Sequence, residues 1–180
     1  MKRSLHRHIA CRSTLAGCIA IATASAAASE NVPAVMQVPA GNYVAWRAPA
    51  EGVITYACRH SQSDASKLQW VIDGAQAKLG ATAGAQGGTY ASPPETWRAA
   101  DGSSLTGIEV VRAPAGADRL YDQLVMANPA GGAGVLSGVT YIQRIVRDGG
   151  AAPGSPCDRA SLNQRVGVPY RASYVFWKPD

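Results

Sequence analysis

Short runs rich in β-branched and aromatic residues, separated by Gly, Pro and Asp-Gly turn signals, make up most of the chain after residue 40. The 3.6-residue apolar repeat of an amphipathic helix is hard to find among them, so the runs predict strands. The expected strands are Asn42–Ala48, Gly52–Arg59, Leu68–Ile72, Ala75–Leu79, Leu105–Arg112, Gln123–Ala127, Val135–Val146 and Ala172–Lys178. This pattern predicts one all-β, mainly antiparallel domain, either a β-sandwich or a partly closed barrel.

The most strand-like stretch, VTYIQRIVRDGG (139–150), carries Gln143 and Arg144 in its middle. Alternate side chains of a strand point to opposite faces, so one polar group interrupts each face. We interpret Arg144 as a buried structural residue whose donors are satisfied by a carboxylate such as Asp101 or Glu109 and by carbonyls, and Gln143 as its less buried neighbour. A role in ligand binding is the alternative. Another local signal, Asp73-Gly74, predicts a tight hairpin turn between two strands.

The N-terminus has the layout of a secretory signal peptide, which we place at residues 1–28. A basic region is followed by the apolar run 13–23 and by the small residues ASAAAS, with cleavage expected after Ala26 or Ala28. The remaining domain, 29–180, is then exported to the periplasm or secreted. The string LAGC (15–18) offers a lipoprotein with a lipidated Cys18 as a minor alternative, but most of the apolar run follows that cysteine.

Removing this leader changes the charge balance of the chain. The sequence holds 17 basic and 12 acidic residues, and four of the basic ones, Lys2, Arg3, Arg7 and Arg12, lie in the leader. The rest carries 17 − 4 = 13 basic against 12 acidic residues, a net charge of +1. No basic surface for nucleic acid or for a membrane is therefore expected. The apolar run is also too short for an integral membrane span, which needs roughly 20 residues.

The leader also contains two of the four cysteines, which leaves Cys58 and Cys157. Two cysteines in an exported domain most often form a disulfide, and a reactive thiol is the alternative. His60 is the one histidine after the leader, so a histidine-rich metal site is excluded. The Gly-rich stretches lack the dinucleotide-binding spacing, and we expect no cofactor and no metal. The polar string HSQSD (60–64) is interpreted as a loop rather than as a hydrolase site.

Tryptophan and tyrosine supply most of the aromatic side chains and could form a stacking surface for a ligand. We expect Trp70 and Trp177 to belong to the core. Tyr90 and Trp97 flank the loop-like string SPPET, which makes them the candidate ligand-binding residues of a surface site.

Several longer motifs carry a family resemblance: Y-x-C at 56–58, TWRAADGSSLTG at 96–107, GAGVLSGVTYIQRIVRDGGAAPGSPC at 132–157 and VPYRASYVFW at 168–177. Together they resemble an uncharacterised family of secreted bacterial and fungal proteins, a domain of unknown function, from about residue 41 to residue 177. The resemblance implies one secreted β-rich domain and supports Cys58 and Cys157 as structural partners. Some fungal relatives carry a malate dehydrogenase label, which finds no support in this sequence. Thr89 stands where the family pattern has a histidine.

These observations favour an exported, non-enzymatic β-domain that binds a small ligand, a glycan or an envelope partner. An extracytoplasmic hydrolase that uses His60, or a purely structural envelope protein, are the alternatives.

Overall fold

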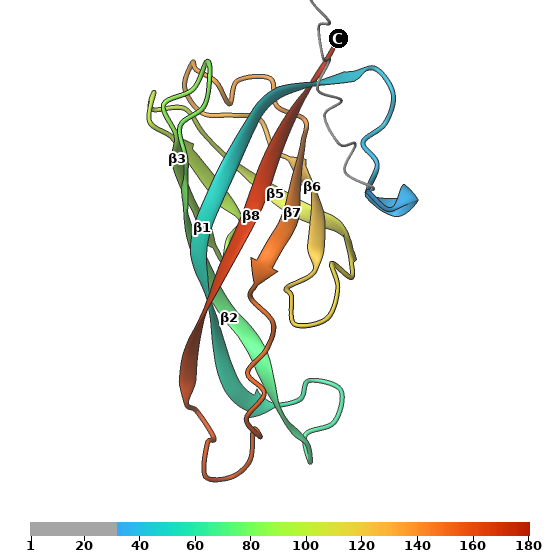
Figure 1. Ribbon diagram of the computed structural model, residues 1–180, viewed down its shortest axis with the longest axis vertical. Helices are drawn as coiled ribbons and strands as arrows, with labels where there is room; N and C mark the ends of the chain where they lie inside the picture. The colour runs from blue at the N-terminus through green and yellow to red at the C-terminus, as the bar shows by residue number, and fades with distance from the viewer. Residues whose placement is uncertain (1–31) are drawn as a thin grey trace, which may run out of the picture. The chain divides into compact units, whose positions relative to one another are not determined.

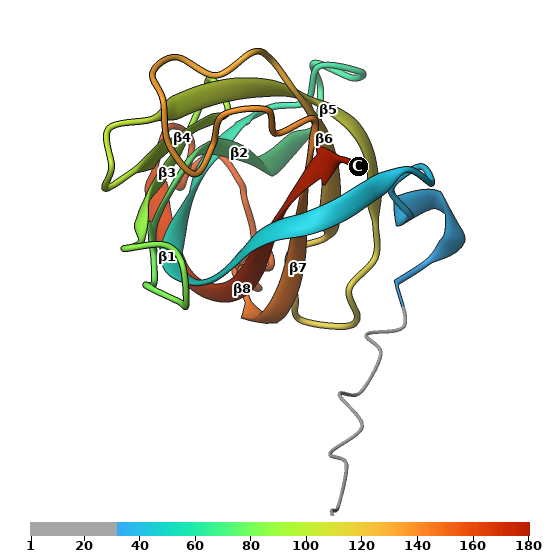
Figure 2. The same ribbon diagram turned by 90° about the horizontal axis from the view of Figure 1, so that it is seen from above.

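The computed structural model describes residues 32–180, and the predicted leader with Cys18 lies outside these described residues. Eight antiparallel strands follow one another around a closed barrel, each paired with its neighbours in sequence and the last with the first (Figures 1 and 2). They are β1 (Asn42–His60), β2 (Leu68–Leu79), β3 (Gly88–Ser92), β4 (Thr96–Ala99), β5 (Ser104–Ala113), β6 (Asp122–Ala127), β7 (Tyr141–Gly149) and β8 (Arg165–Pro179). The prediction of an all-β, antiparallel fold is confirmed, and the sheet closes fully.

Two pairs of predicted strands are each one long strand, β1 and β2. Gly52 was expected to begin a second strand, yet it lies inside β1. A glycine is needed at this position because a side chain would overlap the Gln76 carbonyl oxygen and the Tyr170 ring. The hairpin predicted at Asp73-Gly74 is wrong. Asp73 is instead the extra residue of a β-bulge, opposite the shift of register between Thr55 and Tyr56.

The structure also contains two short strands that the pattern did not predict, β3 and β4. Conversely, residues 135–140 of the predicted strand Val135–Val146 belong to the loop between β6 and β7. Their apolar side chains, Leu136 and Val139, are buried in the core. Val135 and Leu136 donate backbone hydrogen bonds to Asp101 Oδ2 and Ser103 Oγ, at 2.6 and 3.3 Å. The loop lies at one end of the barrel, near the top of Figure 1, and its buried side chains close that end. We call residues 135–140 the plug.

The barrel interior is rich in aromatic side chains. Trp46 stacks on Phe176 with ring centroids 4.6 Å apart, and Tyr90 lies against Trp97 and Tyr174 at 5.3 and 5.1 Å. Trp70 and Trp177 were expected in the core, and both are half-buried. Trp70 packs against the core cluster, whereas Trp177 is not part of it. They lie on β2 and β8, where each indole N–H finds an acceptor: Ser155 O at 2.8 Å for Trp70 and Gln143 Oε1 at 2.8 Å for Trp177.

A smaller apolar cluster lies outside the barrel, under the 3-10 turn η1 (Ala34–Met36). Met36 is fully buried there against Ala113 and Leu124 of β5 and β6. The segment before β1 thus covers part of the outer surface of the sheet.

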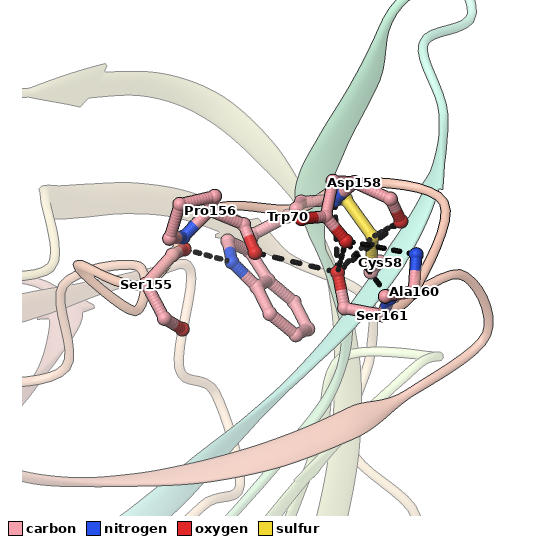
Figure 3. The surroundings of a disulfide bond; sticks show 8 residues. Cys58, Trp70, Ser155, Pro156, Asp158, Ala160 and Ser161 are labelled. Carbon is pink, nitrogen blue, oxygen red and sulfur yellow. Dashed lines mark hydrogen bonds between the residues drawn. A yellow bond between two sulfur atoms is a disulfide. The ribbon is translucent and has the colours of Figure 1, made fainter.

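A disulfide joins Cys58 of β1 to Cys157 in the β7–β8 loop, with 5.4 Å between the Cα atoms (Figure 3). Ser161 supports the loop beside it by accepting a hydrogen bond from the Asp158 N–H at 2.8 Å. The two cysteines are 99 positions apart in sequence, so the disulfide ties an early strand to a late loop at the end of the barrel opposite the plug. Within residues 32–180, no helix has the length and apolar character needed to cross a membrane.

Candidate functional site: a cavity in the barrel

A cavity of about 850 Å³ occupies the barrel end that the plug leaves free, and we call it the barrel cavity. Its buried walls come from several strands and include apolar, aromatic and polar side chains. They are Ile54, Tyr56, Ala75, Tyr90, Leu120, Gln123 and Arg144. Exposed residues such as Gln62, Ser63 and Ala152 belong to the β1–β2 and β7–β8 connections and form its rim. The cavity therefore has a solvent-exposed rim and a buried inner wall.

Arg144 is the buried cation of this wall. Its side chain points from β7 to the barrel interior and is 4% exposed. Nη2 donates one hydrogen bond, to the Tyr121 carbonyl oxygen at 3.3 Å, and the guanidinium lies 5.6 Å from the centre of the Tyr121 ring. The Nε–H is sealed from solvent and has no hydrogen-bond partner among the described residues.

The expected carboxylate partners of Arg144 lie elsewhere. Asp101 caps the loop at the plugged end of the barrel, where it accepts hydrogen bonds from the Ser103 N–H and hydroxyl at 2.9 and 2.6 Å. Glu109 lines the cavity but forms an ion pair with Arg112, which donates from Nε to Oε1 at 2.7 Å. The structure corrects the pairing because a β-bulge between Glu109 and Val111 in β5 brings Glu109 and Arg112 to the same face of the strand.

Two carboxylates of the cavity are bridged by one amide. Gln123 Nε2 donates to Glu95 Oε1 at 3.1 Å and to Glu109 Oε2 at 2.7 Å. Glu95 also accepts a hydrogen bond of 2.5 Å from the Tyr90 hydroxyl. Both carboxylates thus have fixed donors, whereas the oxygen of the Gln123 amide is buried without a partner in the described part of the chain.

Burial and charge set the protonation of these groups. Burial acts to lower the pKa of Arg144, but it is outweighed by attraction to the Tyr174, Tyr90 and Tyr170 phenolates that form at high pH and to the Glu95 carboxylate, so the pKa lies above its ordinary value. Burial raises the pKa of Tyr90 far above its ordinary value, and the nearby Glu95 carboxylate adds to the effect. The inner wall therefore presents a permanently charged guanidinium among neutral phenols at neutral pH.

Tyr56 completes the phenolic wall. Its hydroxyl donates to the Gly150 carbonyl oxygen at 2.7 Å, and burial raises its pKa to about 12. Nearby, the hydroxyls of Tyr170 and Tyr174 lie 3.0 Å apart. Tyr56 lines the cavity, whereas Tyr170 and Tyr174 are not part of its lining.

The predicted surface site at Tyr90 and Trp97 is wrong in one respect, because both side chains point into the barrel and are 2% and 0% exposed. The SPPET string is the β3–β4 turn, and the two residues face each other across the hairpin. Tyr90 lines the barrel cavity, whereas Trp97 lies behind it and is not part of the lining. His60 is exposed, with Nδ1 2.6 Å from the Ala65 carbonyl oxygen, and is also not part of the lining.

Gln143 lies on the opposite face of β7 and is as buried as Arg144, at 4% exposed, which corrects the expectation of a less buried neighbour. Its Nε2 donates to the Met36 carbonyl oxygen at 2.6 Å, and its Oε1 accepts from Trp177. The segment around η1 covers Gln143. The expectation failed because strand alternation shows which face a side chain is on, but not whether another segment covers that face.

The sequence pattern did not identify Glu95, Arg112, Tyr121 and Gln123 as members of the site, and it indicated Glu109 only as a partner of Arg144. One signal could have found part of it. Gln123 and Arg144 are both polar residues in apolar strands, and they are cross-strand partners in the β6–β7 ladder. No group of three His, Cys, Asp or Glu side chains in the described part of the chain is arranged to hold a metal ion.

Comparison with known families finds one family along the barrel. Residues 39–91 and 81–178 match the family described as "Protein of unknown function (DUF3455)". The chain belongs to this family. The two matched segments overlap and together run from before β1 to the last residues of β8, so the family match covers the whole barrel and the walls of its cavity. No curated protein and no solved structure matches the chain.

Proposed function

We propose that this chain is a non-enzymatic binding protein that holds a small organic molecule in the barrel cavity. The observation that carries the proposal is the cavity itself, with a volume of about 850 Å³. Ligand pockets in proteins are concave, mainly apolar and typically ~300–1,000 Å³, with a few polar groups that fix orientation. One end of the barrel is plugged by Leu136 and Val139, so a ligand would enter and leave by the other.

The arrangement of polar groups supports binding over chemistry. A general acid or base needs a proton that it can exchange with a substrate. Glu95 and Glu109 are each engaged by two donors of the protein, which suits a fixed polar wall. The hydrolase alternative relied on His60, whose ring contacts a backbone carbonyl of its own loop.

We also propose that binding takes place outside the cytoplasm. Two features support export: the leader predicted at residues 1–28 and the disulfide between Cys58 and Cys157. Disulfides persist in the periplasm and outside the cell, whereas cytosolic thiols are kept reduced.

A cavity-filling variant with a matched surface control tests the proposal. Ala75 is buried and lines the cavity from β2, whereas Ala91 is exposed on the adjacent β3. The oxidised domain, unaltered and as Ala75→Met and Ala91→Met, would be screened by thermal shift against a library of small organic molecules. We expect a subset of compounds to raise Tm of the unaltered chain and of Ala91→Met, because binding to the folded state stabilises it. The same compounds should fail to stabilise Ala75→Met.

Two outcomes would count against the proposal. Compounds that stabilise Ala75→Met as strongly as the unaltered chain would bind outside the cavity. A complete lack of response across the library, combined with binding to a glycan array or to an envelope protein, would favour the surface-binding alternatives.

A further inference from the structure

The barrel cavity contains a buried positive charge without a contacting counter-ion. Arg144 is its one buried cation among the described lining residues, since Arg112 and Arg119 are largely exposed. The ion pair of Arg112 with Glu109 satisfies that guanidinium. Arg144 has no ion pair within residues 32–180, and its guanidinium donates to one carbonyl oxygen, that of Tyr121. A buried charge is costly to the fold unless it is paired, so an unpaired one in a cavity points to a partner that arrives from outside.

We propose that the ligand of the barrel cavity is an organic monocarboxylate whose carboxylate contacts the Arg144 guanidinium and whose apolar body lies along the aromatic walls. This inference rests on the proposed binding function and specifies its ligand class. Guanidinium and carboxylate form the strongest type of hydrogen-bonded pair in proteins, because both partners are charged. Because Nε is sealed, the carboxylate would be bound by the terminal nitrogens of Arg144.

The remaining walls suit an aromatic or otherwise apolar body. Ile54, Ala75 and Leu120 provide an aliphatic surface, and the rings of Tyr56, Tyr90 and Tyr121 face the same cavity. The hydroxyls of Tyr56 and Tyr90 already donate to Gly150 and Glu95, so these rings offer mainly their apolar faces. Aromatic faces of this kind favour planar hydrophobic groups.

The charge of the walls favours a monoanion over a dianion. Arg144 is the one buried guanidinium among the described lining residues and can neutralise one negative charge, and the carboxylates of Glu95 and Glu109 would repel a second. A phosphate monoester carries more than one negative charge at neutral pH. The site is therefore expected to prefer carboxylates to phosphates of the same body.

The test compares acids with neutral analogues of the same shape. Benzoate, 3-phenylpropionate and cinnamate would be titrated by calorimetry into the oxidised domain, each beside its primary amide, with phenyl phosphate as the dianion. We expect the best acid to bind about tenfold to a hundredfold more tightly than its amide, the range for a hydrogen bond to a charged group. Added salt should weaken the binding of the acid more than the binding of its amide.

Variants then test whether Arg144 causes the preference for the acid over the amide. Arg144→Met should abolish the difference between acid and amide, and Arg144→Lys should retain part of it because the charge stays. Arg98→Met is the matched control, since Arg98 is exposed on β4 outside the cavity. It should leave the preference unchanged.

The outcomes separate the two proposals. Acid and amide of equal affinity, or a preference that survives Arg144→Met, would overturn the carboxylate assignment while the cavity remains a binding site. Tighter binding of phenyl phosphate would also overturn it. If neither acids nor amides bind at millimolar concentration and the library screen above yields ligands, the carboxylate assignment fails alone. If that screen is also empty, both proposals fail. The acid–amide comparison uses the unaltered chain, so it holds even where a variant does not fold.

Discussion

Gln143 and Arg144 are adjacent on β7, point to opposite faces of the barrel wall and are equally buried, at 4% exposed each. Gln143 lies under the η1 segment, where it links the Met36 carbonyl oxygen to the Trp177 indole. Arg144 lies in the barrel cavity with one hydrogen bond from its side chain to the described part of the chain. The side chain of Gln143 is therefore fully hydrogen-bonded within the fold, whereas Arg144 keeps donors that the described part of the chain does not use.

This contrast predicts opposite effects on stability. Gln143→Leu should lower the free energy of unfolding by about 1–3 kcal/mol, because it leaves the buried Met36 carbonyl oxygen without a donor. Arg144→Met should leave it unchanged or raise it by up to about 2 kcal/mol, because an apolar side chain replaces a poorly paired buried charge. Urea titrations of the two variants beside the unaltered domain would measure both changes.

The reverse order would contradict the contrast. If Arg144→Met lost several kcal/mol and Gln143→Leu lost nothing, Arg144 would be the structural residue that its sequence pattern first indicated, as expected for a tightly paired buried ion.

Local pattern predicted the fold class and parts of all but two strands, because β-branched and aromatic runs with turn signals reflect the period of a strand. It failed to predict strand bounds and loops that depend on contacts between distant segments. Gly52 looked like a break, yet the close approach of Tyr170 requires a glycine inside β1. Leu136 and Val139 looked like strand residues, yet they plug the barrel end. An apolar run shows that residues are buried, but not which element buries them.

The cavity was harder to predict than the fold. Its polar groups come from strands far apart in sequence, such as Glu95 and Gln123, and barrel closure alone brings them together. Tyr90 was identified as a ligand-binding candidate by its position beside SPPET, but whether it faced solvent or the interior depended on the register of β3. A shift of one residue reverses the face of every side chain in a strand.

The disulfide should make a large contribution to stability. Replacing Cys58 and Cys157 by alanine together is expected to lower the free energy of unfolding by about 2–5 kcal/mol, as found when native disulfides are removed from small secreted domains. The closed loop is long, with a sequence separation of 99 between the cysteines, so the unfolded chain gains much freedom. Urea unfolding of the oxidised and reduced domain would measure the loss.

The double variant serves as the control for reductant. Its unfolding midpoint should not respond to dithiothreitol, whereas that of the unaltered domain should fall. Equal midpoints of the oxidised and reduced unaltered domain would contradict a structural role for this bond.

A methyl group at Gly52 should be poorly tolerated. A Cβ there would overlap the backbone carbonyl oxygen of Gln76 on β2 and meet the Tyr170 ring on β8, so strands on both sides would have to move. Gly52→Ala is expected to lower the free energy of unfolding by about 1–3 kcal/mol, the range for overpacking. Gly154→Ala is the control, because nothing lies within 4 Å of a Cβ at that exposed loop position. Thermal unfolding of both variants would compare them, and equal Tm values would contradict the close packing of β1.

The plug at the closed end should make stability depend on pH through Asp101. The Ser103 hydroxyl lowers the pKa of this carboxyl most, and the backbone N–H groups of Val135 and Ser103 lower it further. Since the pKa is lower in the folded state than in the unfolded chain, Asp101 stabilises the fold above the unfolded pKa of about 3.9. That contribution is lost as pH falls through the lower folded pKa.

Asp101→Asn tests this dependence. An amide cannot accept at both positions, so the variant should unfold at lower urea concentration than the unaltered domain at pH 7. The difference should shrink as pH falls below about 3.9, where the unaltered carboxyl also becomes neutral. Urea midpoints for both proteins between pH 2 and pH 7 would trace it. A gap that stays constant over this range would mean that the charge of Asp101 does not hold the plug, and that the shape of the side chain alone does.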